Sequence, residues 1–299
     1  MDTDMIGKIN RLKKEKNAVI LAHNYQRPEI YEVADFLGDS LELAKKAVNT
    51  DAKIIVFCGV DFMAESAKIL NPEKMVLHPE ELSVCPMAAM VTVECVLEAK
   101  QKYPKSVIVS YINTTADVKA VSDICCTSAN AVKVVNSLKE DEVIFTPDRN
   151  LGTYVQTKSK KKIILLDGHC YVHDNISVED VKKAKELHPD AEVMVHPECR
   201  MEVIKEADAV CSTSQMIKYS KESSASEFIS VTECGMAIML KREIPNKKFW
   251  AVGGTCLQMK NITLEKVYDC LFNETGKVEL DQNIMDNAKK ALDAMLNVS

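Results

Sequence analysis

The sequence predicts an α/β fold of three related units, each a small parallel sheet with flanking helices. Short apolar runs alternate with amphipathic helical patterns along the chain, as in βαβ units. Three polar triplets, each closing an apolar run, recur at nearly equal intervals: His23–Asn24–Tyr25, Tyr111–Ile112–Asn113 and His196–Pro197–Glu198. Self-similarity with a period this long indicates repeated domains rather than a solenoid, whose repeats are shorter.

Each unit also repeats four single positions after its triplet. A hydroxyl residue follows the first member of each triplet at a constant spacing, and an aspartate stands at a fixed place shortly before that hydroxyl. A cysteine comes later at a nearly constant spacing, and a hydroxyl residue typical of helix N-caps follows each cysteine in the same register. In chain order these are Asp35, Ser40, Cys85 and Thr92, then Asp123, Ser128, Cys170 and Ser177, then Asp208, Thr213, Cys256 and Thr263. Three matching units imply one shared site at a pseudo-threefold axis.

The elements of each unit follow from runs such as "AVILA", read as buried strands, and from amphipathic stretches, read as helices. In the first unit, strands are expected at 18–25, 52–60 and 74–79, and helices at 27–38, 40–50, 61–72 and 92–104. In the second unit, strands are expected at 107–113, 142–148 and 162–167, and the closing helix at 177–189. In the third unit, they are expected at 191–198, 227–233 and 248–254, with the closing helix at 263–274.

The same patterns give the domain limits. Three repeat domains are expected at 18–104, 105–190 and 191–275, each with one of the matching cysteines. The segments 1–17 and 276–299 are expected to be terminal helical segments that pack on the repeats.

Composition excludes several classes of protein. The chain has 299 residues, of which 46% are hydrophobic and 27% charged, and its net charge of −6 argues against binding of nucleic acid. No apolar run approaches the roughly 20 residues of a membrane span. The first residues lack the apolar core and cleavage site of a signal peptide, so a cytoplasmic location is expected.

Eleven cysteines are many for such a chain, and a disulfide framework is not expected in the cytoplasm. Most are interpreted as small buried residues, and only Cys85, Cys170 and Cys256 share a register. Three converging thiolates suggest a metal centre. A zinc site of three cysteines and one histidine stays possible, because Cys170 and His173 have C-x-x-H spacing. Three cysteines on a [4Fe–4S] cluster would instead leave one iron open, which suits Lewis-acid dehydration chemistry.

The polar triplets and hydroxyls are expected around that centre. Ligands of open α/β sheets bind beyond the carboxyl ends of the strands, where the triplets fall. Ser40, Ser128 and Thr213 begin or precede helical segments, where hydroxyl and free N–H groups favour anions. Simple helix capping is the alternative explanation for these hydroxyls.

Several long segments carry a resemblance to a known family. "ILAHNYQRPEIYEVADFLGDSLELAKKA", "GVDFMAESAKILNP", "YINTTADVKAVSDICCTSANAV", "PDRNLG", "GHCYVH" and "HPEC" resemble the quinolinate synthases, from about Ile20 to Met259. The resemblance implies three Rossmann-like domains around a pseudo-threefold axis. It also implies one [4Fe–4S] cluster per chain, with three cysteine ligands and one open iron. The implied reaction, part of NAD biosynthesis, condenses iminoaspartate with dihydroxyacetone phosphate to quinolinate, releasing phosphate and two waters.

The resemblance assigns roles residue by residue. The cluster ligands would be Cys85, Cys170 and Cys256. The catalytic residues would be Glu198, as principal acid and base, together with Tyr25, His23 and Tyr111. The substrate pocket would be lined by His23, Ser40, Tyr111, Ile112, Asn113, Ser128, His173, His196, Pro197, Glu198 and Thr213, with Met63 and Met259 as apolar walls.

The expected partners are therefore the two small substrates and, functionally, an enzyme that makes iminoaspartate from aspartate. Neither nucleic acid nor a membrane is expected as a partner. Two alternatives stay open at this point: a non-catalytic sensor with a structural zinc, and a cluster-containing dehydratase of a small hydroxy acid.

Overall fold

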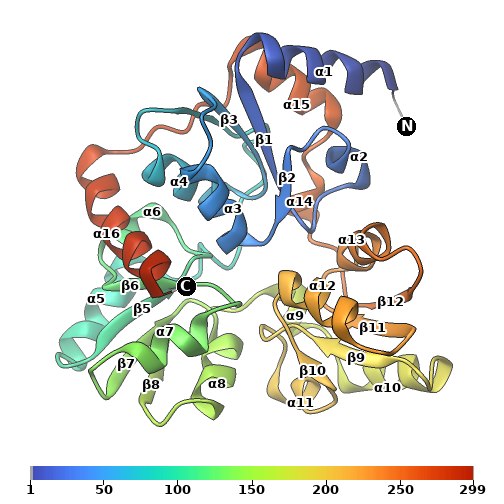
Figure 1. Cartoon of the computed structure of the whole chain (residues 1–299). Coiled ribbons are helices and arrows are strands. Elements are labelled where there is room, and N and C mark those ends of the chain that lie inside the picture. Colours follow the sequence, from blue (N-terminus) through green and yellow to red (C-terminus); the bar gives the residue numbers. More distant parts are fainter. Residues whose placement is uncertain (1–2, 299) are drawn as a thin grey trace.

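Three separate sheets of four strands form the frame of the molecule in a computed structural model that describes residues 3–298 (Figure 1). All strand pairs within the named sheets are parallel, and the strand order is the same in each: β2-β1-β3-β4, β6-β5-β7-β8 and β10-β9-β11-β12. The predicted α/β fold class is thereby confirmed. Residues 1, 2 and 299 of the predicted terminal segments lie outside the described residues.

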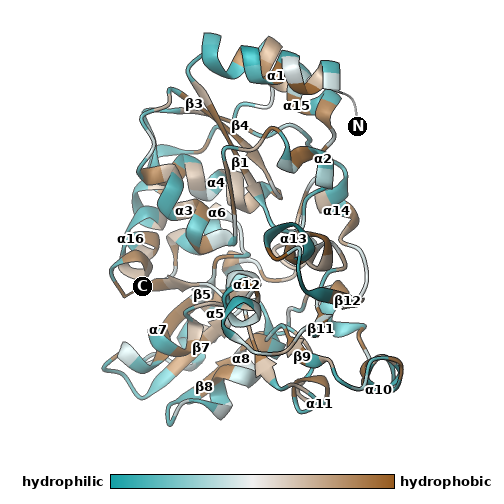
Figure 2. Ribbon diagram, turned by 45° about the vertical axis from the view of Figure 1, so that its right-hand side comes forward, coloured by the Kyte–Doolittle hydropathy of each residue, from teal (hydrophilic) through white to brown (hydrophobic). Residues whose placement is uncertain are grey.

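The strands keep similar lengths in the three sheets. The first sheet contains β1 (Ala18–His23), β2 (Phe36–Gly38), β3 (Ile54–Cys58) and β4 (Met75–Leu77). The second contains β5 (Val107–Tyr111), β6 (Ile124–Cys126), β7 (Glu142–Thr146) and β8 (Lys162–Leu165). The third contains β9 (Glu192–Val195), β10 (Ala209–Val210), β11 (Glu227–Val231) and β12 (Lys248–Val252). The strands are mostly hydrophobic along their length (Figure 2).

Helices connect and cover these strands. Those up to the second sheet are α1 (Thr3–Glu15), α2 (Pro28–Tyr31), α3 (Ser40–Val48), α4 (Asp61–Leu70), α5 (Val93–Lys102) and α6 (Ala116–Ala120). Next come α7 (Ala131–Ser137), α8 (Arg149–Thr157), α9 (Tyr171–Asp174), α10 (Val178–Leu187) and α11 (Met201–Ile204). The last are α12 (Thr213–Glu222), α13 (Gly235–Glu243), α14 (Leu257–Lys260), α15 (Leu264–Asn273) and α16 (Gln282–Val298). Among the described residues, no helix is long and apolar enough to cross a membrane.

The second strand of each unit was not predicted from the sequence. The predicted helix at 27–38 is wrong beyond Tyr31, because this segment ends in the short strand β2. An aspartate just before each such strand bonds to the backbone of the neighbouring strand. The Asp35 carboxylate accepts the N–H of Ile20 at 2.8 Å, and the backbone N–H of Asp35 donates to the Ile20 carbonyl at 2.8 Å. Asp123 and Asp208 make the same pair of contacts in the other two sheets. The repeated aspartates therefore join the start of each short strand, β2, β6 or β10, to the strand beside it.

The helix after each cysteine loop packs on the sheet of another unit. Val96 of α5 lies in a core cluster with β5 and β7 of the second sheet. Val181 of α10 packs with β9, β11 and β12 of the third sheet. Val267 of α15 returns to the first sheet and packs there with Ile9 of α1. Figure 1 shows α15 beside α1, although the two are far apart in the chain.

These helices bear on two earlier predictions. The caps expected at Thr92, Ser177 and Thr263 are confirmed, because each side chain accepts an N–H in the first turn of its helix. The proposed domain limits group each helix with the sheet before it, whereas the apolar faces of α5 and α10 pack on the sheet after them and that of α15 packs on the first sheet. Near the other end of the chain, α16 packs on α6, β6 and α4.

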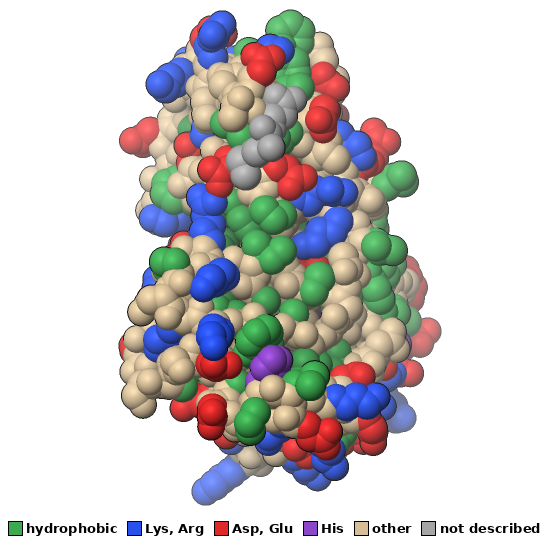
Figure 3. All heavy atoms as spheres, turned by 90° about the vertical axis from the view of Figure 1, so that its right-hand side faces the viewer, with side chains coloured by type: hydrophobic (Ala, Val, Ile, Leu, Met, Phe, Trp, Pro, Cys, Tyr) green, Lys and Arg blue, Asp and Glu red, His purple; other side chains and the backbone are tan. Residues whose placement is uncertain are grey.

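One face of the molecule shows how charge is distributed. In Figure 3, basic and acidic side chains gather toward the two ends and the edges, while hydrophobic and uncharged side chains occupy most of the middle. No side of this view is dominated by one sign of charge.

Candidate active site

One cavity lies where the carboxyl ends of strands from the three sheets meet. It collects residues from all three units, as the repeats predicted. The predicted site residues that line it are His23, Tyr25, Ser40, Met63, Cys85, Tyr111, Asn113, Ser128, Cys170, His173, His196, Glu198, Thr213, Cys256 and Met259. Two predicted residues do not line it: Pro197, which is buried, and Ile112, which is 1% exposed and packs in the core.

Glu198 is the centre of the polar contacts in this cavity. The hydroxyl of Tyr111 donates to its Oε1, and Nδ1 of His173 lies 3.1 Å from its Oε2. Nδ1 of His196 lies 4.0 Å from Oε1, and the rings of His173 and His196 stack at 4.6 Å. A carboxylate with a phenol and two imidazoles around it has the components of an acid and base system.

Thr232 joins a second tyrosine to this group. Its hydroxyl shares a hydrogen bond of 2.6 Å with the Tyr25 hydroxyl and contacts Nε2 of His173 at 2.8 Å. Tyr25 from the first unit and His173 from the second are thereby joined by a residue of the third. Sequence analysis did not single out Thr232, although it follows β11 directly, as the triplets follow their own strands.

Burial and charge set the protonation of these groups. Burial lowers the pKa of His23 and of His196, in each case to about 3, so both imidazoles are neutral near pH 7. Burial raises the pKa of Tyr25 and of Tyr111 well above the ordinary value, and the Glu198 charge raises both further. Burial also acts to raise the pKa of Glu198, but His173 and the hydrogen bond from the Tyr111 hydroxyl outweigh burial and hold the pKa below its ordinary value. The cavity therefore holds an ionised carboxylate beside protonated phenols.

The shifts at His23 and His196 predict a loss of stability in mild acid at these two sites, which the raised pKa of the buried Asp148 opposes. Below about pH 6.5 the unfolded chain takes up protons at His23 and His196 that the folded chain, with a pKa near 3 at both sites, does not. Each histidine contributes a fall of up to about 1.4 kcal/mol per pH unit in this window. Urea unfolding of the metal-free protein between pH 7.5 and 5.5 measures the slope, and His196→Gln should reduce it. An unchanged slope in that variant would contradict the assignment.

None of the three candidate anion-binding hydroxyls is the N-cap of its helix, because Asn130 holds that place in α7. Asp39 caps α3 and Ser212 caps α12, each one residue before the hydroxyl in question. Ser40 and Thr213 are the first helical residues and line the cavity, where the Thr213 hydroxyl accepts from Nδ2 of Asn24 at 3.0 Å. The capping explanation is therefore wrong for all three positions. Ser128 lies shortly before α7 and also lines the cavity.

The three cysteines in register reach the cavity from three separate loops. Cys170 and Cys256 occupy the N-cap positions of α9 and α14, and Cys85 lies in the loop before α5. Each is half-buried, and all eleven cysteines are free. Burial raises the pKa of each of the three thiols, and the charge of a neighbouring one raises it further for Cys85 and Cys170. Three thiols that line one cavity, with no disulfide among them, are a donor set that a soft metal centre could use.

A smaller set of donors overlaps with this one. Sγ of Cys170, a ring nitrogen of His173 and a carboxylate oxygen of Glu198 all lie within 4.8 Å of one another. This set differs from the predicted zinc site of three cysteines and one histidine, because it includes Glu198. Both ring nitrogens of His173 already have neighbours, Glu198 at Nδ1 and Thr232 at Nε2.

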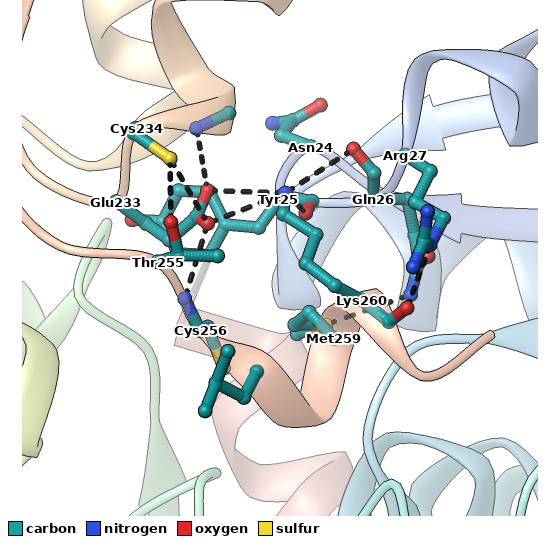
Figure 4. A network of polar contacts seen from close by, with 12 residues as sticks. Asn24, Tyr25, Gln26, Arg27, Glu233, Cys234, Thr255, Cys256, Met259 and Lys260 are labelled. Carbon is teal, nitrogen blue, oxygen red and sulfur yellow. Dashed lines mark hydrogen bonds and ion pairs between the residues drawn. The ribbon is translucent and has the colours of Figure 1, made fainter.

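Glu233 and Lys260 form a second buried network, which sequence analysis missed (Figure 4). Glu233 also lines the cavity, and its Oε1 accepts the N–H of Cys256 at 3.2 Å while Oε2 accepts the N–H of Gly235 at 2.7 Å. Nζ of Lys260 lies 3.2 Å from Oε1 of Glu233 and donates to the carbonyl of Tyr25. The ion pair therefore ties the Cys256 loop to the segment that carries Tyr25.

Comparisons with known proteins identify the family of this chain. The sequence model of the family described as quinolinate synthetase A protein matches residues 7–297. A quinolinate synthase of Thermococcus kodakarensis is 50% identical over 299 residues, which cover 99% of this chain and 98% of the relative. Quinolinate synthase 2 of Methanosarcina acetivorans is 51% identical over 293 residues, covering 97% and 94%. A quinolinate synthase of Methanocaldococcus jannaschii is 50% identical over 307 residues and covers both chains fully. With a family match over nearly its whole length and relatives at half identity, this chain belongs to the quinolinate synthetase A protein family and is an enzyme.

Proposed function

We propose that the enzyme condenses iminoaspartate with dihydroxyacetone phosphate to form quinolinate, with release of phosphate and two waters, in the de novo synthesis of NAD. The observation that carries the proposal is the position of Glu198. Its carboxylate lies in a cavity lined by the three cysteines in register and receives a hydrogen bond from Tyr111. Dehydration and ring closure need proton transfer, and a Lewis-acid metal assists the departure of hydroxide; this cavity offers groups for both.

The residues fit a [4Fe–4S] cluster, one per chain. Cys85, Cys170 and Cys256 come from three loops and face one cavity, and a cluster held by three thiolates keeps one iron free of protein ligands. Such an iron supplies Lewis-acid chemistry to an oxygen of the substrate. The surrounding pocket is lined by histidine, tyrosine, hydroxyl and apolar side chains, by Asn113 and by the acidic residues Asp39, Glu198 and Glu233.

The remaining side chains have separate tasks in this proposal. Ser40 and Thr213, at the starts of α3 and α12, bind the anionic groups of the substrates together with Ser128 and Asn113. Glu198 is placed to accept a proton from substrate carbon or nitrogen, because its ionised carboxylate lines the cavity. Tyr111, which already donates to Glu198, and Tyr25, which is held by Thr232, carry protons that they can give to a leaving hydroxyl.

The proposed reaction also implies a supplier and a compartment. Iminoaspartate is an unstable imine, so we propose functional coupling to an enzyme that forms it from aspartate. A cytoplasmic location, proposed from the sequence, agrees with eleven free thiols.

An anaerobic assay tests the proposal. Protein purified without oxygen is expected to be brown, to hold about four irons per chain and to form quinolinate from iminoaspartate and dihydroxyacetone phosphate. Iron-containing protein that forms no quinolinate but dehydrates a small hydroxy acid would favour the dehydratase alternative. Colourless protein with one zinc would support a zinc site in place of the cluster. The sensor alternative is not retained, because the chain is an enzyme.

A further inference from the structure

In each of the three cysteine loops, the backbone N–H of the cysteine donates a hydrogen bond to a carboxylate of the same unit. The N–H of Cys85 donates to Oδ1 of Asp61 at 3.0 Å. The N–H of Cys170 donates to Oδ2 of Asp148 at 3.2 Å, and that of Cys256 to Oε1 of Glu233 at 3.2 Å. We call Asp61, Asp148 and Glu233 the loop carboxylates. Because the same contact occurs in all three units, it is a feature of the repeat and not an accident of one loop.

The loop carboxylates occupy equivalent places in the fold. The first strand of each unit, β1, β5 or β9, pairs with the short strand on one side and with β3, β7 or β11 on the other. Each loop carboxylate follows β3, β7 or β11. Asp61 is the first residue of α4, Asp148 caps α8, and Glu233 lies two residues before α13. Asp148 and Glu233 are fully buried, with exposed fractions of 0% and 1%. Burying a carboxylate is costly unless its oxygens are hydrogen-bonded, so these contacts are what makes the positions tolerable.

We infer, on the basis of the proposed cluster, that the loop carboxylates are positioning residues for the cluster ligands. A hydrogen bond from the N–H of a cysteine fixes the backbone of that residue, and the backbone fixes the direction of its Cβ–Sγ bond. Three such anchors therefore hold three thiols toward one point before any metal enters, as second-shell groups do for other metal centres.

The third loop carboxylate has an additional partner. Glu233 pairs with Lys260, whose ammonium also donates to the carbonyl of Tyr25 (Figure 4). The anchor of Cys256 is thus linked through one lysine to the segment of a proposed catalytic residue, whereas those of Cys85 and Cys170 have no such link in the contacts of residues 3–298.

Asp61 offers the cleanest test of the inference. Its Oδ1 accepts the N–H of Cys85, and asparagine would keep an oxygen at that place. At Asp148 both oxygens accept an N–H, Oδ1 from Leu151 and Oδ2 from Cys170, so asparagine would turn its NH₂ toward one donor. The comparison is therefore Asp61→Ala, which removes the acceptor, against Asp61→Asn, which keeps it.

The experiment measures how firmly each protein holds iron. After anaerobic reconstitution, Asp61→Ala is expected to lose iron to a chelator about tenfold faster than the unmodified protein, the usual scale for a second-shell group. Asp61→Asn should lose it at nearly the unmodified rate. Asp123→Ala is the matched control, because the Asp123 carboxylate also accepts a backbone N–H, at Ile108 near the start of β5 and away from the cavity. It should lower the melting temperature and leave iron loss unchanged.

Several outcomes would overturn the inference. Asp61→Ala holding iron as well as the unmodified protein would do so, as would Asp61→Asn losing iron as fast as Asp61→Ala. A second measurement does not depend on the cluster: in metal-free protein, alkylation of Cys85 should be several-fold faster in Asp61→Ala than in Asp61→Asn. Equal alkylation rates would reject the anchor, whereas absence of iron from the unmodified protein would reject the proposed cluster alone.

Discussion

Replacing Cys85, Cys170 or Cys256 by alanine is expected to remove the cluster and with it all quinolinate formation. The proposed cluster has only three protein ligands, so the loss of one thiolate leaves two of its four irons without a protein ligand. Iron and labile sulfide per chain after anaerobic reconstitution measure the effect, together with absorption near 400 nm. We expect each of the three variants to fall to the background of protein that was never reconstituted.

Cys199→Ala is the matched control for these variants. Cys199 directly follows Glu198 in the chain, yet it is fully buried in the core of the third unit, with its sulfur 3.9 Å from the Val231 carbonyl. Its replacement should leave iron and sulfide intact and cost some stability through the cavity it creates. Full iron and sulfide in Cys256→Ala would contradict the proposed ligand set.

Glu198→Gln is expected to cut turnover by about 10²–10⁴, the range for a group that transfers protons. Glutamine matches glutamate in size and can still accept the hydrogen bond from Tyr111, but it cannot take a proton. The cluster should assemble normally, because Glu198 is not among its proposed ligands. Quinolinate formed per iron under anaerobic conditions separates this effect from any loss of cluster.

An exposed carboxylate nearby provides the comparison for Glu198. Glu202 lies on α11 and pairs with Arg200 at 3.1 Å, with its side chain 57% exposed. Glu202→Gln should keep normal turnover, because exposed ion pairs contribute little. If Glu198→Gln also keeps near-normal turnover, the acid and base role belongs to another group.

Repetition made much of this molecule predictable. The triplets, hydroxyls and cysteines recur in register, and register alone selected three cysteines from eleven. The structure brings those three to one cavity with His23, Tyr111 and Glu198. Ile112 shows the limit of this reasoning, because a triplet at a strand end points alternate side chains to opposite faces, and its middle member packs in the core.

Other features carry too weak a signal in the sequence. The strands β6 and β10 are too short to show an alternating pattern. The spacing between each loop carboxylate and its cysteine differs from unit to unit, and one of the three is a glutamate, so no fixed register reveals them. An amphipathic pattern shows that α15 buries one face, but it does not say which sheet receives that face.

The packing of α15 on the first sheet affects the order in which the three units can fold during translation. Domains usually fold as they emerge, beginning at the N-terminus. Here the second and third sheets receive their covering helices, α5 and α10, from sequence made before them. The first sheet must wait for residues 264–273, near the end of translation, before Ile20 and Val56 are covered. The sheet synthesised first is therefore completed last, and until then its apolar face depends on α1 or on a chaperone.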